Sequence, residues 1–253
     1  MTIKVRRVEL SDISDMREMY REAMRCQIIH DSIHTRAGWT REYLITVDDM
    51  VAGYGSVAVL GPWTDKPTLY EFFVLEQHNL RVLDMFRELL SATGAVMAET
   101  QSNDPLLTTM LHIFAHTVEA EAILFEDTRS TALTLPDAVF RPKTVEDDAA
   151  IAAQSLDREA GWLVALDGAV AATGDILYHY NRPYGDLYMA VAEPYRRRGI
   201  GSFIVQELKR VCYEGGSVPA ARCNPSNLAS RSTLQRAGFV PCGVLLHGTI
   251  AGQ

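Results

Sequence analysis

The sequence holds few of the features that mark secreted, membrane-spanning or zinc-binding proteins. Its 253 residues include only four cysteines, which are widely spaced and form no CxxC pair. Reduced thiols in the cytoplasm explain them better than a disulfide framework or a zinc site. No apolar run approaches the roughly 18–20 residues of a spanning helix, and the N-terminal stretch MTIKVRRVELSD lacks the apolar core of a signal peptide. We therefore expect a cytoplasmic protein that binds no metal and no membrane.

Positive charge is also scarce. The chain has 24 lysines and arginines against 32 aspartates and glutamates, a net charge of −8. Proteins that bind nucleic acids usually carry a basic surface, so we expect no nucleic-acid partner. Any site for an anionic ligand must then be local, because the protein as a whole repels anions.

The order of predicted elements repeats once along the chain. Each half reads as strand, helix, hairpin, strand, helix, strand, helix and strand, from apolar periodicity and turn signals. A helix is expected over residues 12–32, and an Asp167-Gly168 turn indicates a hairpin in the second half. The predicted fold class is α/β of the α+β type. The predicted domains are residues 1–127 and 138–253, joined by a linker over 128–137.

One short stretch combines positive charge with glycine. The sequence RRRGIG, residues 196–201, lies between a predicted strand over 187–192 and a predicted helix over 200–212. A helix N-terminus has unpaired N–H groups and a partial positive charge, and glycines allow a ligand to approach the backbone closely. The stretch therefore predicts a cradle for a diphosphate, in preference to a solvated basic turn.

Other phosphate-binding loops do not fit these residues. A Walker loop requires Gly-Lys-Ser/Thr, which is missing here. A dinucleotide fingerprint requires a third glycine, and Ile204 stands in its place.

Together with a second motif, this stretch resembles the GNAT superfamily of acetyl-CoA-dependent N-acetyltransferases. RRRGIG matches the family pattern [Q/R]-x-x-G-x-[G/A], and Asn227-Leu228-Ala229-Ser230 followed by Ala237-Gly238-Phe239 resembles the next family motif. The resemblance implies tandem GNAT domains, each a mixed, mostly antiparallel sheet flanked by helices. The N-terminal half has Glu76-Gln77-His78-Asn79 where the glycine loop should stand, so it resembles a degenerate copy.

The resemblance also implies where acetyl-CoA binds. Backbone amides of the loop would hold the pyrophosphate, the pantetheine arm would pair with the strand before the loop, and a backbone N–H near Val191 would polarise the thioester carbonyl. The expected cofactor-binding residues are Met189, Ala190, Val191, Arg196, Arg197, Arg198, Gly199, Ile200, Gly201, Ser202, Asn227 and Ser230.

Catalytic residues are less clearly indicated. Asp186 and Asp175 are the best candidates for the base that removes a proton from the amine, and His179 is another. Many relatives have a tyrosine that protonates the departing thiolate, but Leu234 stands at that position. Possible substitutes are Tyr188, Tyr178, Tyr180 and Cys223.

The resulting prediction is an N-acetyltransferase whose acceptor is a small-molecule primary amine or a basic side chain. The negative net charge mildly favours a cationic acceptor. A non-catalytic acyl-CoA-binding or sensor protein is the alternative that Leu234 supports, and an interaction module without CoA binding is a further one. Acyl chains longer than acetyl stay open, and the protein is expected to be a monomer or a homodimer.

Overall fold

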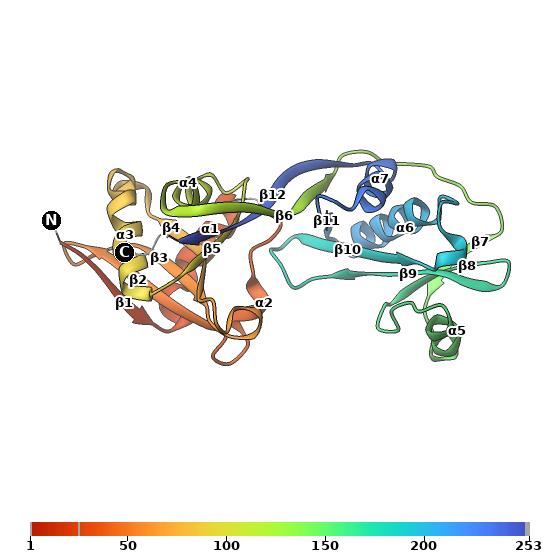
Figure 1. Cartoon of the computed structure of the whole chain (residues 1–253), viewed down its shortest axis with the longest axis horizontal. Coiled ribbons are helices and arrows are strands. Elements are labelled where there is room, and N and C mark those ends of the chain that lie inside the picture. Colours follow the sequence, from red (N-terminus) through yellow and green to blue (C-terminus); the bar gives the residue numbers. More distant parts are fainter. Residues whose placement is uncertain (1, 25, 251–253) are drawn as a thin grey trace. The chain divides into compact units, whose positions relative to one another are not determined.

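The computed structural model describes residues 2–24 and 26–250 and divides into two compact units (Figure 1). The N-terminal unit contains the chain up to Ala122 together with the stretch from Gly243 onward, and the C-terminal unit comprises Ile123–Cys242. The element order predicted from the sequence is confirmed in both halves. No helix in the described ranges is both long and apolar enough to cross a membrane.

The elements that begin in the first half of the chain are β1 (Ile3–Val8), α1 (Ser14–Met24), α2 (Asp31–His34), β2 (Thr40–Val47), β3 (Met50–Ala58), β4 (Thr68–Val74), α3 (Val82–Thr93), β5 (Met97–Gln101), α4 (Pro105–Phe114) and β6 (Ala115–Asp127). The second half contains β7 (Ala138–Pro142), α5 (Asp148–Ala153), β8 (Trp162–Leu166), β9 (Ala169–Leu177), β10 (Tyr184–Val191), α6 (Ile200–Glu214), β11 (Val218–Cys223), α7 (Leu228–Arg236) and β12 (Phe239–Ile250).

The single long helix predicted over residues 12–32 is wrong. Helix α1 ends at Met24, α2 begins at Asp31, and Arg25 between them lies outside the described residues. The backbone of Ile28 is instead bound by the side chain of Gln101, which accepts from its N–H at 3.3 Å and donates to its carbonyl at 2.6 Å. These tertiary bonds replace helical ones, which local periodicity cannot foresee.

Each unit contains a mixed, mostly antiparallel sheet, which confirms the predicted fold class. The strand order is β1-β2-β3-β4-β5-β12 in the N-terminal unit and β6-β11-β10-β9-β8-β7 in the C-terminal unit. Only the β4–β5 and β10–β11 pairs are parallel among the pairs described. Each unit therefore contains one parallel pair among those described. It joins the strand after the hairpin to the strand that follows the next helix.

Helices cover both faces of the C-terminal sheet (Figure 1). On one face Ile204 and Leu208 of α6 pack in a core with Val164 of β8. On the opposite face Ile151 of α5 packs against Leu163. Adjacent strand residues 163 and 164 thus point to opposite sides, as the pleat requires. We refer to these sides as the α6 face and the α5 face.

The predicted domain boundaries differ from the compact units because two strands are shared. Strand β6 begins in the N-terminal unit, but its residues 123–126 pair with β11. Strand β12 begins in the C-terminal unit, and its residues 245–249 pair with β5. The predicted linker 128–137 has no regular structure, yet it belongs to the C-terminal unit, where Leu133 exchanges two hydrogen bonds with Gln206 of α6. The last residues, 251–253, lie outside the described ranges.

A buried lysine holds residues 127 and 129 in place, at the start of the irregular segment 128–137. Lys209 of α6 forms an ion pair with Asp127 at 2.6 Å, and both side chains are 5% exposed. The ammonium also donates to the carbonyls of Arg129 and Ala237 at 2.8 Å each. These hydrogen bonds satisfy the ammonium group inside the fold. A buried ion pair stabilises a protein only when such additional hydrogen bonds are present.

We expect Lys209→Met to destabilise the protein by about 3–5 kcal/mol, because it leaves the Asp127 carboxylate buried without its cation. Urea unfolding followed by fluorescence measures this. The matched control is Arg210→Met on the same helix, where an exposed arginine pairs with Glu207 and Glu214 and the expected loss is below about 1 kcal/mol. Equal losses in the two variants would contradict the assigned role of Lys209.

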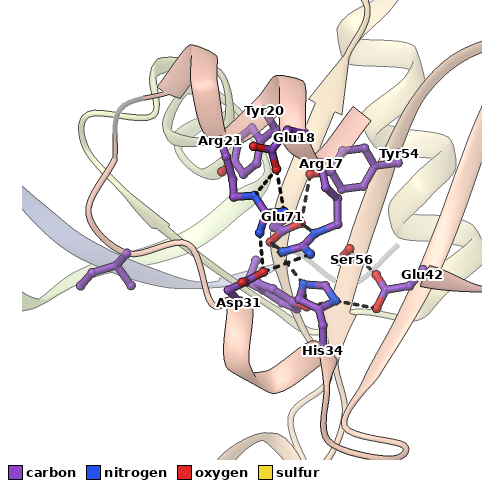
Figure 2. A network of polar contacts seen from close by, with 12 residues as sticks. Arg17, Glu18, Tyr20, Arg21, Asp31, His34, Glu42, Tyr54, Ser56 and Glu71 are labelled. Carbon is purple, nitrogen blue, oxygen red and sulfur yellow. Dashed lines mark hydrogen bonds and ion pairs between the residues drawn. The ribbon is translucent and has the colours of Figure 1, made fainter. Parts of the chain in front are cut away.

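The N-terminal unit buries a polar network beneath α1 and α2 (Figure 2). Glu71 of β4 accepts two bonds of 2.9 Å from the guanidinium of Arg17 and one of 3.0 Å from the Tyr54 hydroxyl. His34 lies between Glu42, at 3.0 Å, and Glu71, at 3.3 Å. Burial alone would lower the pKa of His34, but its hydrogen bonds to the two glutamates outweigh burial and raise it.

The charged form of His34 therefore stabilises the N-terminal unit. Since its folded pKa is raised above the ordinary 6.5, this contribution is full below that value and is lost as the pH rises through the folded pKa. We expect the difference in unfolding free energy between the wild type and His34→Gln to be largest near about pH 6 and to shrink toward about pH 9. Urea titrations across this range measure it. The exposed His116→Gln variant is the control, and a difference for His34→Gln that stays constant with pH would refute the assignment.

Candidate functional site

The RRRGIG stretch forms the predicted turn into a helix. Strand β10 ends at Val191, and α6 begins at Ile200, with Gly199 as its N-cap in the left-handed region at φ 84°. Arg197 also has a positive φ of 62°. No side chain caps the first turn of α6, so its leading N–H groups stay available to a ligand. Left-handed residues in such a loop turn successive N–H groups toward one side, which favours an anion.

This turn borders a cavity of about 890 Å³ in the C-terminal unit. The volume lies in the range of pockets that hold large cofactors. Of the twelve residues predicted to bind the cofactor, all except Arg198 line it. Those residues are Met189, Ala190, Val191, Arg196, Arg197, Gly199, Ile200, Gly201, Ser202, Asn227 and Ser230.

Arg198 departs from the prediction because its side chain lies elsewhere. Its guanidinium lies over the ring of Tyr195, 5.6 Å from the centroid, and it is not among the residues that line the cavity. Arg196, in contrast, donates from Nε to the carbonyl of Val191 at 3.2 Å. The three consecutive arginines therefore have different surroundings, which a sequence run cannot distinguish.

Five residues that line the cavity were not predicted as cofactor-binding: Tyr195 before the turn, and Ala229, Ser232, Thr233 and Arg236 on α7. A helical spacing counted from the predicted Asn227 and Ser230 would have found Thr233 and Arg236, which follow at steps of three. Asn227 itself caps α7 by accepting from the Ser230 N–H at 3.0 Å. Arg236 adds a second source of positive charge to the cavity.

Strands β10 and β11 part beside this cavity. They pair in parallel at residues 184–186 with 218–220, and the last pair is Asp186 with Ala220. Strand β10 continues to Val191 and stays paired with β9. The backbone N–H of Ala192 donates to the carbonyl of Ala171, on the β9 side of the strand. Because N–H groups point to alternate sides along a strand, those of Met189 and Val191 point toward the side where β11 has separated. These groups have no partner on β11, so an extended ligand can pair with them.

The two faces of β10 carry different side chains. Leu187 and Met189 point to the α6 face, where they join its hydrophobic core. The three predicted catalytic residues share the α5 face, since Asp186 and Tyr188 alternate with those residues and Asp175 pairs with Tyr188 across the sheet. The structure thus brings Asp186, Tyr188 and Asp175 together on one face.

The two candidate bases have different partners. Both oxygens of Asp175 accept backbone N–H groups, from Gly161 at 2.9 Å and from Ile176 at 2.8 Å. Within residues 2–24 and 26–250, Asp186 accepts only from Nε of Arg222, at 3.2 Å. Burial raises the pKa of Asp186 to about 6, against the opposing effect of Arg222. Of the two carboxyl groups, Asp186 thus has the raised pKa and the side-chain partner, whereas Asp175 binds backbone N–H groups.

Tyr188 is a weak candidate for the acid. Its hydroxyl donates to Asp157 at 2.9 Å, and burial together with this bond raises the pKa of Tyr188. A phenol that holds its proton more tightly is a poorer donor. Leu234, at the usual tyrosine position, is 6% exposed and packs in the core.

The other residues considered for proton transfer lie in several environments. Tyr178 is 58% exposed, and the rings of His179 and Tyr180 contact each other with centroids 4.1 Å apart. Cys223 is buried in the α6 core, and burial raises the pKa of its thiol. None of these four lines the large cavity.

The N-terminal unit parts its parallel strands in the same way but fills the space. Strands β4 and β5 pair only at Thr68 with Met97 and at Leu69 with Ala98. Beyond them Gln101 binds the backbone of Ile28. The cavity lined by Ile28, Gln101 and their neighbours has a volume of about 10 Å³, room for about one water molecule. A turn over Glu76–Arg81 leads into α3 without any glycine.

Two family models match the sequence. One, described as the acetyltransferase (GNAT) family, matches residues 123–239, and the other, described as an acetyltransferase (GNAT) domain, matches residues 9–128. No curated protein matches the chain. The two models fall on the two halves of the chain, in agreement with the predicted repeat.

Solved structures share the whole architecture. A GNAT-family acetyltransferase from Colwellia psychrerythraea is 14% identical and has a TM-score of 0.78, over 98% of this chain and 100% of that chain. A tandem GNAT protein from the clavulanic acid biosynthesis pathway is 11% identical with a TM-score of 0.64 and full coverage of both chains. A GCN5-related N-acetyltransferase from Sphaerobacter thermophilus is 15% identical and has a TM-score of 0.58, over 99% of this chain and 97% of that chain.

At these identities the solved structures establish the fold, and the family models add the sequence relationship. The glycine turn, the parted strands and both family matches agree. The chain belongs to the GNAT superfamily of acetyltransferases and carries two GNAT units in tandem.

Proposed function

We propose that the C-terminal unit binds acetyl-CoA and transfers its acetyl group to a primary amine. One observation carries the proposal: a cavity of about 890 Å³ extends from the glycine turn of α6 to the parted edge of β10. A long ligand with an anionic end and an amide-rich arm fits such a cavity. When bound, acetyl-CoA supplies an activated acyl group as a thioester.

The turn has the chemistry that a diphosphate requires. Arg197 and Gly199 both adopt left-handed conformations, and Arg196, Arg197 and Arg236 line the cavity. A Cβ at Gly201 would stand 3.1 Å from the methyl group of Thr233, so glycine at this position lets α6 and α7 pack closely beside the turn. Unpaired helix N–H groups and guanidinium groups together favour a dianionic ligand.

The edge of β10 suits the arm of the ligand. The N–H groups of Met189 and Val191 face the parted side and can bind an extended chain as an added strand. A donor at Val191 would polarise a carbonyl placed beside it, and a fixed backbone dipole needs no reorganisation for this.

Asp186 is the residue we assign to proton removal. An amine attacks a carbonyl only when it is neutral, and a carboxylate with a pKa of about 6 is ionised at pH 7 and can accept the proton. As the new N–C bond forms, the C–S bond breaks. Asp186 lies five residues before Val191 on β10, so the amine proton would reach Asp186, and then the departing thiolate, through water. Tyr188 keeps its proton and shapes the α5 face.

The N-terminal unit does not take part in cofactor binding in this proposal. Its parted strands are covered by the segment around Ile28, and the turn before α3 has no glycine. One acetyl-CoA per chain is therefore expected. The reduced state of the four cysteines, all free in the structure, suits a cytoplasmic location for this activity.

Binding without transfer is the second candidate, and one observation favours it. Leu234 stands where many relatives have a proton-donating tyrosine, and it packs in the core without reaching the cavity. Micromolar binding of acetyl-CoA without release of thiol in the presence of any amine would support a sensor in place of a transferase.

We expect Arg197→Glu to weaken acetyl-CoA binding by about ten- to a hundred-fold, because it replaces a charge-assisted contact with repulsion. The neighbouring Arg198→Glu is the matched control, since it makes the same charge change outside the cavity. Calorimetric titration measures both affinities and the stoichiometry. Equal effects of the two changes would place the diphosphate elsewhere, and two molecules bound per chain would refute the single-site assignment.

We expect Asp186→Asn to lower kcat by about 10²- to 10⁴-fold, since it removes the general base. In the wild type, kcat should fall as the pH drops below about 6, because the Asp186 carboxylate is then protonated, and this fall should be missing in the variant. Asp175→Asn is the comparison variant: it should lower the stability of the protein and leave the pH profile of kcat unchanged. An acid limb that persists in Asp186→Asn would exclude Asp186 as the base.

A further inference from the structure

An arginine on β11 lies beside the proposed base. Arg222 is flanked by Ala221 and Cys223, which both point into the core on the α6 face, so alternation places Arg222 on the α5 face. Asp186, its ion-pair partner, lies on the same face. Since Asp186 pairs with Ala220, Arg222 stands two residues beyond the point where the strands part, level with Tyr188.

The guanidinium of Arg222 is held in place but only partly used. Its Nε donates to Asp186 at 3.2 Å, and its plane lies over the ring of Tyr180, 4.8 Å from the centroid. Within residues 2–24 and 26–250 its two terminal nitrogens have no hydrogen-bond partner, and the side chain is 32% exposed. The remaining donors form a planar fork that matches a carboxylate in a bidentate arrangement.

A second polar group on the same face also awaits a partner. The hydroxyl of Thr173 is fully buried and has no hydrogen-bond partner in the described part of the chain. Thr173 pairs with Ala190 of β10, and Ala190 lines the large cavity. A buried hydroxyl without a partner costs about 1–3 kcal/mol unless a ligand or water satisfies it. The two groups lie on strands on either side of β10, and only Arg222 is partly exposed.

We propose that the acceptor is an amino acid, whose carboxylate binds the terminal nitrogens of Arg222 while its amino group lies between Asp186 and the thioester. This inference rests on the proposed function of the same site. In an amino acid the amine and the carboxylate are a few bonds apart, which matches the direct contact between Asp186 and Arg222. Arg222 then anchors the acceptor, and Asp186 removes the proton from its amino group.

The arrangement also explains why Arg222 does not simply neutralise the base. Only one N–H of the guanidinium contacts Asp186, so the carboxylate keeps a free oxygen for the amine. A carboxylate bound on the far side of Arg222 would satisfy the cation without displacing that contact. The acceptor is then selected by an anionic group, although the protein as a whole is acidic.

The test compares each of a set of L-amino acids with its own α-amide, which keeps the amine and removes the negative charge. Release of CoA thiol gives kcat and KM at saturating acetyl-CoA. We expect at least one amino acid to exceed its amide by tenfold or more in kcat/KM. Arg222→Gln should abolish that preference by raising KM for the acid far more than for the amide, and Arg222→Lys should keep part of it.

Each outcome decides the proposal. A variant that merely folds less well would slow the acid and the amide equally, and this result would refute anchoring by Arg222. Equal use of acids and amides by the wild type, or a preference for aminoalkyl phosphates, would overturn the carboxylate assignment. If acetyl-CoA binds but no amino acid is acetylated, the acceptor class is wrong while the cofactor site stands. If acetyl-CoA does not bind, the proposed function fails as well.

Discussion

The separation of two parallel strands is the constraint on which this structure depends. After the pair Asp186–Ala220, β10 continues without β11, and backbone groups that would normally be paired face an open side. Unpaired backbone groups inside a protein are costly, so a fold that contains such a gap must fill it. The C-terminal unit leaves the gap beside a large cavity, which makes it a place for a strand-like ligand. The glycine turn, the arginines and the candidate base are all positioned relative to that gap.

The N-terminal unit shows the other way to satisfy the same constraint. Its strands β4 and β5 also part after two pairs, but the chain segment around Ile28 is bound there by Gln101. Beneath α1 and α2, the charges of Arg17, Glu71 and His34 are paired with one another (Figure 2). A network in which the charged groups satisfy one another rigidifies a unit, and it offers little to a ligand. The same architecture thus leaves a large cavity in one half and fills the corresponding space in the other.

Positive charges in this protein are concentrated locally, although its net charge is negative. The chain carries a net charge of −8, yet three arginines line the cavity of the C-terminal unit. On the opposite face of β10 a single arginine stands beside a carboxyl whose pKa is about 6. One face thus presents positive charge that suits a diphosphate, and the other joins a cation to a proton acceptor. Whole-protein charge would have predicted neither arrangement.

The sequence by itself determined most of the elements and the glycine turn before α6. Apolar periodicity and turn residues are local signals, so the element order, the Asp167-Gly168 hairpin and the helix that begins after Gly199 follow from them. Eleven of the twelve predicted cofactor residues line one cavity because two contiguous motifs contain most of them. The tertiary structure alone decided the break in the first helix, the two shared strands, the separation of Arg198 from Arg197, and the contact of Arg222 with Asp186. Each of these depends on which distant residues meet, as with Gln101 and Ile28 or β12 and β5, and contacts between distant residues leave no period or motif in a single sequence.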